Sequence, residues 1–311
     1  MKPENQTSQT RFVLLGISNI PYLQTLCFVV FLLMYIITLS GNLLLILVVR
    51  INPTLQTPMY FFLSNLSIID ICFSSSVVPK FLVNTLSEDK SISLLECAVQ
   101  MYIHLAMGAC ESILLAVMAY DRFIAICKPL HYKVIMNGKV CFGLAAMAWS
   151  VGFLNSFILV IPTLQLPLCR SNLIDHFFCE IPPFLQMSCT DTRINVIVIY
   201  ISAGIIVMCS FFLTLISYFH IISSILKIRS SRGRYKTFST CASHLAVVTV
   251  FYGTIMFMYM RPRSAYSPKI DKIVPIVYTA VTPMLNPFIY SIRNKNVKET
   301  FKNFQTSQPH L

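Results

Sequence analysis

The chain has 311 residues, of which 56% are hydrophobic and only 12% are charged, and its mean hydropathy is +0.70. Soluble domains carry about 25% charged residues, so this composition excludes a water-soluble fold and a disordered chain. The net charge of +12 does not indicate nucleic-acid binding, because the basic residues lie in short segments between apolar runs and form no continuous basic face.

Seven apolar runs are each long enough to cross a bilayer as a helix, which takes roughly 20 residues. They cover residues 23–49, 58–78, 97–119, 140–161, 194–226, 238–260 and 273–292. The pattern predicts an all-α membrane protein, with a bundle of seven transmembrane helices over residues 23–292. Residues 1–22 are largely polar and contain no cleavable signal peptide, so we expect an N-terminal tail there.

The loops between these runs predict the orientation, because Lys and Arg favour the cytoplasmic side of a membrane. Most Lys and Arg residues fall on inner segments when the N-terminus is extracellular, so we expect a multi-pass plasma-membrane protein in that orientation. Asn5 begins an Asn-Gln-Thr sequon, which could be glycosylated only on the outer face. Residues 293–311 form an inner tail that suits a short amphipathic helix on the membrane surface, from the positions of Phe301, Phe304, Lys298 and Lys302.

The connection between the fourth and fifth spans is the longest, and a loop of that length usually has a function. It contains Cys169, Cys179 and Cys189, and Cys97 opens the third span on the same outer face. Four cysteines on the oxidising side of the membrane allow three different pairings.

Two acidic residues, Asp70 and Glu111, lie deep within spans, where a carboxylate is costly and faces an interior polar cavity. With the side chains of Asn42, Ser112 and Asn286, they could hold a sodium ion, the only cofactor we expect. Alternatively, one carboxylate stays protonated, or the groups close a hydrogen-bond network without an ion.

Asp121 and Arg122 lie at the inner end of the third span. Arg122 is a permanently charged fork that Asp121 can hold, and moving the fork between partners would build two states. Tyr218 and His244, at the inner ends of the fifth and sixth spans, could be partners for Arg122 or for each other. An interhelical hydrogen bond without switching is the alternative for His244.

Two prolines, Pro283 and Pro287, interrupt the seventh span. Neither can donate a backbone hydrogen bond, which weakens the helix locally. We expect a bend near Asn286 and Pro287, and the alternative is a static kink of the kind that proline gives many spans.

A set of motifs in fixed order resembles the rhodopsin-like G-protein-coupled receptors, and within them the tetrapod-type olfactory receptors. The motifs are residues 12–16 (FVLLG), 41–42 (GN), 58–63 (PMYFFL), 118–127 (MAYDRFIAIC), 128–132 (KPLHY), 217–218 (SY), 236–245 (KTFSTCASHL) and 283–290 (PMLNPFIY). Phe123 stands where the family usually has Tyr, and Thr237 where it usually has Ala. Both departures conserve shape.

The resemblance implies roles that the residues alone leave open. It implies disulfides Cys97–Cys179 and Cys169–Cys189, and it places Asp70 at the sodium-site position of the superfamily. It also implies coupling to a stimulatory, olfactory-type G protein that raises cyclic AMP. The residues that it assigns to coupling and switching are Asp121, Arg122, Tyr218, His244, Asn286, Pro287 and Tyr290.

The outer half of the bundle is the candidate ligand cavity. Its predicted lining is His104, Leu105, Gly108, Ala109, Ser202, Ile205, Ile206, Tyr252, Ile255, Tyr259, Ile276 and Thr279. Apolar walls with a few hydroxyls and one imidazole suit a small, mostly neutral odorant, and no acidic residue lies at this level to pair with an amine. For any single position, interhelical packing is the alternative.

Other classes of function fit less well. A channel or transporter would need a continuous polar path, but the spans are mostly apolar below Glu111. An enzyme is not expected, because neither a zinc-binding His/Glu motif nor a Gly-x-Ser-x-Gly elbow is present in the sequence. The expected partners are therefore an odorant, a heterotrimeric G protein and membrane lipid, and not nucleic acid.

Overall fold

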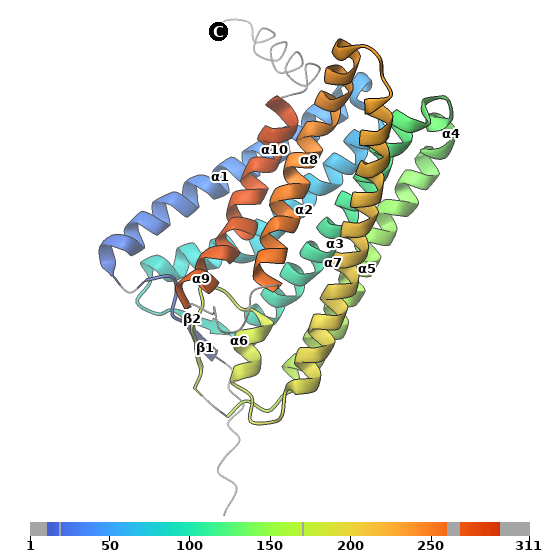
Figure 1. Ribbon diagram of the computed structural model, residues 1–311. Coiled ribbons are helices and arrows are strands. Elements are labelled where there is room, and N and C mark those ends of the chain that lie inside the picture. The colour runs from blue at the N-terminus through green and yellow to red at the C-terminus, as the bar shows by residue number, and fades with distance from the viewer. Residues whose placement is uncertain (1–10, 19, 170, 260–267, 293–311) are drawn as a thin grey trace, which may run out of the picture.

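The computed structural model describes residues 11–18, 20–169, 171–259 and 268–292. These residues form seven helical spans of membrane length in an elongated bundle, which confirms the predicted all-α fold class (Figure 1). The first six spans are α1 (Pro21–Ile51), α2 (Pro58–Leu86), α3 (Leu94–Cys127), α5 (Gly138–Leu164), α7 (Arg193–Leu226) and α8 (Ser231–Tyr259). The seventh consists of α9 (Pro268–Ile276), a π-helical segment (Val277–Val281) and α10 (Thr282–Ile292). Shorter helices in the connections are η1 (Pro53–Leu55), η2 (Pro129–His131), α4 (Tyr132–Ile135) and α6 (Ile181–Gln186).

Several helices extend beyond their apolar runs. Helix α3 begins at Leu94, three residues before the predicted start, because Ser93 caps it: Ser93 Oγ accepts a hydrogen bond from the Glu96 N–H at 3.2 Å, and Glu96 Oε2 accepts from the Ser93 N–H at 2.8 Å. At its inner end α3 continues to Cys127. Asp121 is therefore a helical residue with a fixed direction, and not part of a loop.

The seventh span departs from α-helical geometry in a π-helical segment that ends at Val281. Pro287, near which a bend is expected, lies within α10. Pro283 follows this segment and cannot donate to the carbonyl four residues before it. The Thr282 hydroxyl satisfies another carbonyl of the segment, donating to Val277 at 3.0 Å.

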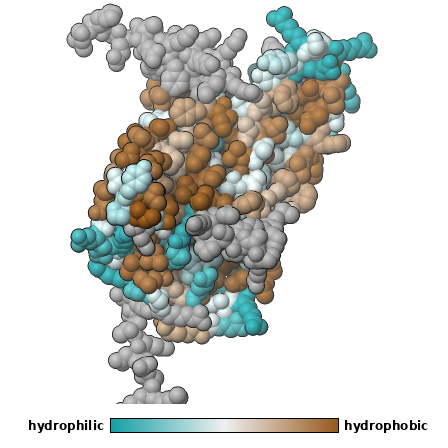
Figure 2. Space-filling model, turned by 60° about the vertical axis from the view of Figure 1, so that its left-hand side comes forward, coloured by the Kyte–Doolittle hydropathy of each residue, from teal (hydrophilic) through white to brown (hydrophobic). Residues whose placement is uncertain are grey.

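The flanks of the bundle are apolar. Figure 2 shows hydrophobic side chains over the helices between more hydrophilic ends. In the most apolar 18-residue stretch of α7, only 6% is buried within the protein. Such an exposed apolar flank is stable only in lipid, as expected for a multi-pass membrane protein.

A small folded cap covers the end of the bundle at which the described chain begins (Figure 1). Its sheet has the strand order β2 (Ser91–Ser93), β1 (Arg11–Leu14), β3 (Leu173–Ile174), with β1 antiparallel to β2 and parallel to β3. Phe12 and Leu14 point into the cap and are buried, so this part of the predicted tail is folded. The glycosylation sequon at Asn5 and the predicted amphipathic helix in residues 293–311 lie outside the described residues.

Candidate ligand cavity and inner switch

Two disulfides hold the long loop in the cap. Cys97 pairs with Cys179 and Cys169 with Cys189, the same pairs that the resemblance implies, with Cα atoms 5.4 and 5.6 Å apart. Gln100 reinforces the first pair, because its side-chain oxygen accepts from the Cys179 N–H at 2.7 Å. The Gln100 side-chain nitrogen donates to a carbonyl of α2 at 2.8 Å, so the loop, α2 and α3 form one unit.

An aromatic cluster surrounds His104, the imidazole predicted to line the ligand cavity. The ring centroid of His104 lies 4.4 Å from Phe73, 4.9 Å from Phe178 and 5.7 Å from Tyr278. His104 is buried, and its Nδ1 has no hydrogen-bond partner within the described structure. The site therefore offers apolar ring faces and one free polar atom, which suits a small ligand with a single polar group.

Residues around His104 that sequence reasoning missed come from three different elements. Phe73 is on α2, Phe178 is in the long loop and Tyr278 is in the π-helical segment. The Tyr278 hydroxyl donates to Glu180 Oε1 at 2.9 Å. The sequence predicted no acidic residue at this level of the spans, but the long loop brings Glu180 to it. A one-dimensional pattern gives no signal for such a loop contact.

The predicted lining on α7 does not converge on this cluster. The Ser202 hydroxyl bonds to Asn155 on α5, so it faces that helix. Ile205 is 59% exposed and faces outward, where lipid would contact it, which corrects its assignment to the cavity. The rotation of α7 about its axis sets the directions of the Ser202 and Ile205 side chains, because successive residues on a helix turn by about 100°. Ile206 is partly buried.

The remaining predicted residues lie either beside the aromatic cluster around His104 or deeper in the helical core. On α3, Leu105, Gly108 and Ala109 are partly buried, and a side chain at Gly108 would meet Phe73 at 3.7 Å. Tyr252 lies deeper in the helical core, where its hydroxyl donates to the Ser112 carbonyl at 3.2 Å.

The other lining positions also lie in the helical core or near the aromatic residues of the long loop. Ile255 packs against the core that contains Tyr252. Ile276 packs against a hydrophobic cluster that contains Phe177 and Phe178. Thr279 is buried, and its hydroxyl donates to the Pro275 carbonyl in the same span. The side chain of Tyr259 lies outside the described part of the structure.

The five residues of the predicted sodium site are all buried. Asn286 Nδ2 donates to both Asp70 oxygens, at 3.1 and 3.0 Å, which links α10 to α2. Asn42 Nδ2 donates to the Pro283 carbonyl at 3.1 Å. Four oxygens of this group have no hydrogen-bond partner within the described structure: Asn42 Oδ1, Glu111 Oε1, Ser112 Oγ and Asn286 Oδ1. Oxygen atoms are the ligands that hard cations prefer, so the residues fit such an ion.

At the inner end of the bundle, Asp121 holds Arg122. The Arg122 Nε donates to Asp121 Oδ2 at 3.0 Å. The other oxygen, Asp121 Oδ1, accepts from the Tyr132 hydroxyl at 2.7 Å, a partner that sequence reasoning did not assign. Tyr132 lies outside the spans, and burial and the Asp121 carboxylate raise its pKa, so its hydroxyl remains a donor at neutral pH.

Tyr218 and His244 bond to each other and not to Arg122. The Tyr218 hydroxyl lies 2.7 Å from His244 Nδ1, and their rings stack with centroids 5.8 Å apart. His244 Nε2 lies 3.1 Å from the Leu115 carbonyl oxygen, which ties α8 to α3. Tyr290 lies four residues after Asn286 on α10 and is buried. Its hydroxyl has no hydrogen-bond partner within the described structure. The inner end thus holds a restrained arginine and a separate pair of potential partners.

Seven spans, a cap held by disulfides and a buried charged network at the opposite end form a seven-helix membrane protein. Residues 31–307 match the olfactory receptor family. The chain is 49% identical over 298 residues to olfactory receptor-like protein OLF1 of Canis lupus familiaris, covering 96% of both chains. It is 50% identical over 295 residues to olfactory receptor 5I1 of Homo sapiens, covering 95% of this chain and 94% of the relative.

The match extends to a third mammal. Olfactory receptor 5AP2 of Mus musculus is 50% identical over 299 residues, with 96% of this chain and 94% of the relative covered. The chain belongs to the olfactory receptor family. It is therefore a G-protein-coupled receptor of a family that is not enzymatic, and a multi-pass membrane protein.

Proposed function

We propose that this receptor binds small, mostly neutral odorants beside His104 and activates a stimulatory, olfactory-type G protein that raises cyclic AMP. The observation that carries this proposal is the inner network, in which Asp121 and Tyr132 restrain Arg122 while Tyr218 and His244 pair separately. The Arg122 guanidinium would thus have two sets of partners: Asp121 in one state, and Tyr218 with His244 in the other. Exchange between them would open the inner face to the G protein.

The aromatic cluster supports the choice of ligand. Phe73, Phe178 and Tyr278 supply apolar ring surface around an imidazole with an unpaired Nδ1. Glu180 accepts one hydrogen bond there, from the Tyr278 hydroxyl. A bound odorant shifts the two states only by its difference in affinity for them. A contact between odorant and Tyr278 would reach the seventh span directly, since Tyr278 lies in its π-helical segment.

The buried polar group in the middle of the bundle supports a sodium ion as an accessory ligand. Asp70 and Glu111 supply negative charge, and Asn42, Ser112 and Asn286 supply further oxygen atoms. The ion would offset the repulsion between two buried carboxylates. Replacing sodium with choline in the medium should change odorant potency of the native chain but not of Glu111→Gln. Equal responses of both proteins to this exchange would favour a proton on one carboxylate instead.

A cyclic-AMP reporter screen against a broad odorant panel tests the proposed function. Cells with the stimulatory olfactory G protein should respond to some odorants in a dose-dependent manner, and matched cells without its α-subunit should not. An odorant-evoked membrane current that persists in the second cells would instead support a channel.

A further inference from the structure

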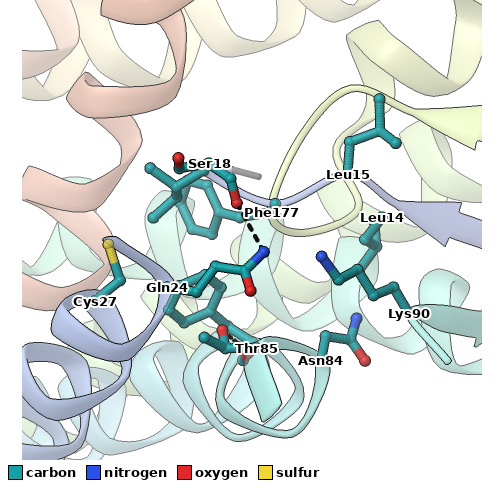
Figure 3. A pocket seen from close by; sticks show the side chains of 12 residues that line it. Leu14, Leu15, Ser18, Gln24, Cys27, Asn84, Thr85, Lys90 and Phe177 are labelled. Atoms are coloured by element: carbon teal, nitrogen blue, oxygen red, sulfur yellow. Dashed lines mark hydrogen bonds between the residues drawn. The ribbon is translucent and has the colours of Figure 1, made fainter. Parts of the chain in front are cut away.

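The two ends of the bundle differ in how their charges are balanced. At the cap end, three cationic side chains are each paired with a carboxylate: Lys80 with Glu96, Arg193 with Asp191, and Lys272 with Asp175. The recess beside the cap presents little open surface, because Phe81 and Phe177 in its lining are buried (Figure 3). Of the described acidic residues, only Asp121 lies at the inner end, where it is buried against Arg122.

Basic side chains crowd the turn that joins α7 to α8, at the end of the bundle opposite the cap (Figure 1). The four described cations of this basic turn are all exposed: Lys227, Arg229, Arg232 and Arg234. The sequence contains no acidic residue from residue 192 to residue 270. No ion pair to any of the four cations occurs among the described residues. Their charge is therefore available to a partner outside the chain.

The backbone of the basic turn is held in a fixed shape. Ser230 caps α8, since its Oγ accepts a hydrogen bond from the Gly233 N–H at 3.3 Å and its carbonyl accepts from the Arg234 N–H at 3.0 Å. Side chains on a helix lean toward its N-terminus, so Arg232 and Arg234 extend toward Arg229 in the turn. The positive end of the α8 dipole lies at the same place and also favours an anion.

Exposed apolar side chains lead up to the basic turn on both helices. On α7 they include Ile222 and Leu226, the last residue of the helix. On α8 they are Tyr235 and Phe238. Apolar flanks of this kind lie in lipid, and tyrosine is typical of the membrane–water interface. The basic turn therefore lies close to the lipid headgroups.

We propose that the basic turn binds a polyphosphoinositide of the cytoplasmic leaflet. Clusters of four or more Lys and Arg residues beside a transmembrane helix attract lipids of this class. Three of the four cations are arginines, whose planar fork matches the oxygens of a phosphate group. One headgroup, bound by cations on both sides of Ser230, would link the inner ends of α7 and α8. The Tyr218–His244 bond joins the same two helices.

Native mass spectrometry of the full-length receptor in detergent, titrated with dioctanoyl phosphatidylinositol bisphosphate, tests the proposal without odorant or G protein. It can therefore fail independently of the proposed signalling function. A Lys or Arg near anionic lipid changes affinity by about fivefold. Arg229→Gln and Arg232→Gln should each weaken binding by about that factor. The matched control is Arg50→Gln, which removes an exposed inner arginine of α1 and should bind as the native chain does.

A second pair of variants changes the charge of the basic turn without removing a cation. Ser231 is the exposed first residue of α8 and lies between Arg229 and Arg232 in sequence. Ser231→Glu should weaken lipid binding by about fivefold, because its carboxylate competes with the phosphates for the same arginines. Ser231→Gln, of similar size and without charge, should not weaken it.

Two further ligands separate a phosphoinositide from other anions. Dioctanoyl phosphatidylserine, with fewer charges, should bind more weakly than the bisphosphate lipid, and so should free inositol trisphosphate, which has no acyl chains. Equal binding of either ligand would overturn the proposal, since the turn would then bind any anionic lipid or a soluble anion. Unchanged binding by Arg229→Gln and Arg232→Gln, or an equal loss in Arg50→Gln, would overturn it as well.

Discussion

Removal of the Tyr132 hydroxyl should raise signalling in the absence of odorant. This hydroxyl donates to Asp121 Oδ1 at 2.7 Å, while the other Asp121 oxygen holds Arg122. The Asp121 side chain is fully buried, so in Tyr132→Phe no water would readily replace the lost donor. The state in which Asp121 holds Arg122 should therefore lose stability relative to the state in which Arg122 is released.

The size of the effect follows from the charge of the acceptor. A hydrogen bond to a charged group contributes about 1.5–3 kcal/mol, and about 1.4 kcal/mol changes an equilibrium tenfold. The released state should gain roughly ten- to a hundredfold in population relative to the restrained one. For a receptor whose active state is a minor species, on the order of 1% at rest, this change is a large rise in basal output.

Basal cyclic AMP, measured without odorant and divided by surface receptor level, checks this prediction. Tyr120→Phe is the matched control, because Tyr120 is adjacent to Asp121 in sequence but 41% exposed. Since burial and Asp121 raise the pKa of Tyr132 above its ordinary value of about 10, the neutral donor persists at all lower pH. The difference between Tyr132→Phe and the native chain should therefore be the same at pH 6 and pH 8.

Basal output of Tyr132→Phe equal to that of the native chain, at matched surface level, would refute this reasoning. Asp121 would then hold Arg122 equally well without its second partner. A rise of the same size in Tyr120→Phe would also count against it, because that change leaves the Asp121 network intact.

Gly152→Ala should lower the stability of the bundle by about 1–3 kcal/mol in thermal unfolding, because the added methyl would lie 2.8 Å from the Ala106 carbonyl oxygen on α3. Gly143→Ala, which meets nothing within 4 Å, should not lower it, and equal losses would contradict the packing argument. An epitope tag at Met1 should be stained on intact cells, and staining only after permeabilisation would reverse the assigned orientation. His104→Phe keeps the ring but loses both nitrogens, so potency should fall by up to about tenfold for odorants with a polar oxygen. An equal shift for hydrocarbon odorants would argue that His104 only packs.

The fold was largely predictable because each span carries its own signal. A run of roughly 20 apolar residues must be helical in a bilayer, whatever lies beside it, and this requirement located all seven spans. Their ends were harder to predict, because polar residues can also be helical. The Ser93–Glu96 capping box starts α3 before its apolar run. The folding of Phe12 and Leu14 into a cap was not predictable, because a four-residue strand depends on β2 and β3.

The candidate sites were predictable where charge identified them. Asp70 and Arg122 stood out as charged groups in an apolar sequence, and the structure places Asn286 and Asp121 in hydrogen-bond contact with them. Which face of a helix points inward depends on its rotation against its neighbours, and local sequence does not determine that. Ile205 was therefore misplaced, and the aromatic residues around His104 were missed.

Odorant-evoked cyclic AMP from Arg122→Ala, at a surface level matched to the native chain, tests the central claim that Arg122 carries the signal to the inner face. The substitution removes the charged fork that Asp121 holds and leaves the Tyr218–His244 pair in place. Arg50→Ala is the control, since Arg50 is an exposed arginine in the last turn of α1. We expect the evoked response to be lost in Arg122→Ala and retained in Arg50→Ala. A full response from Arg122→Ala would contradict the account.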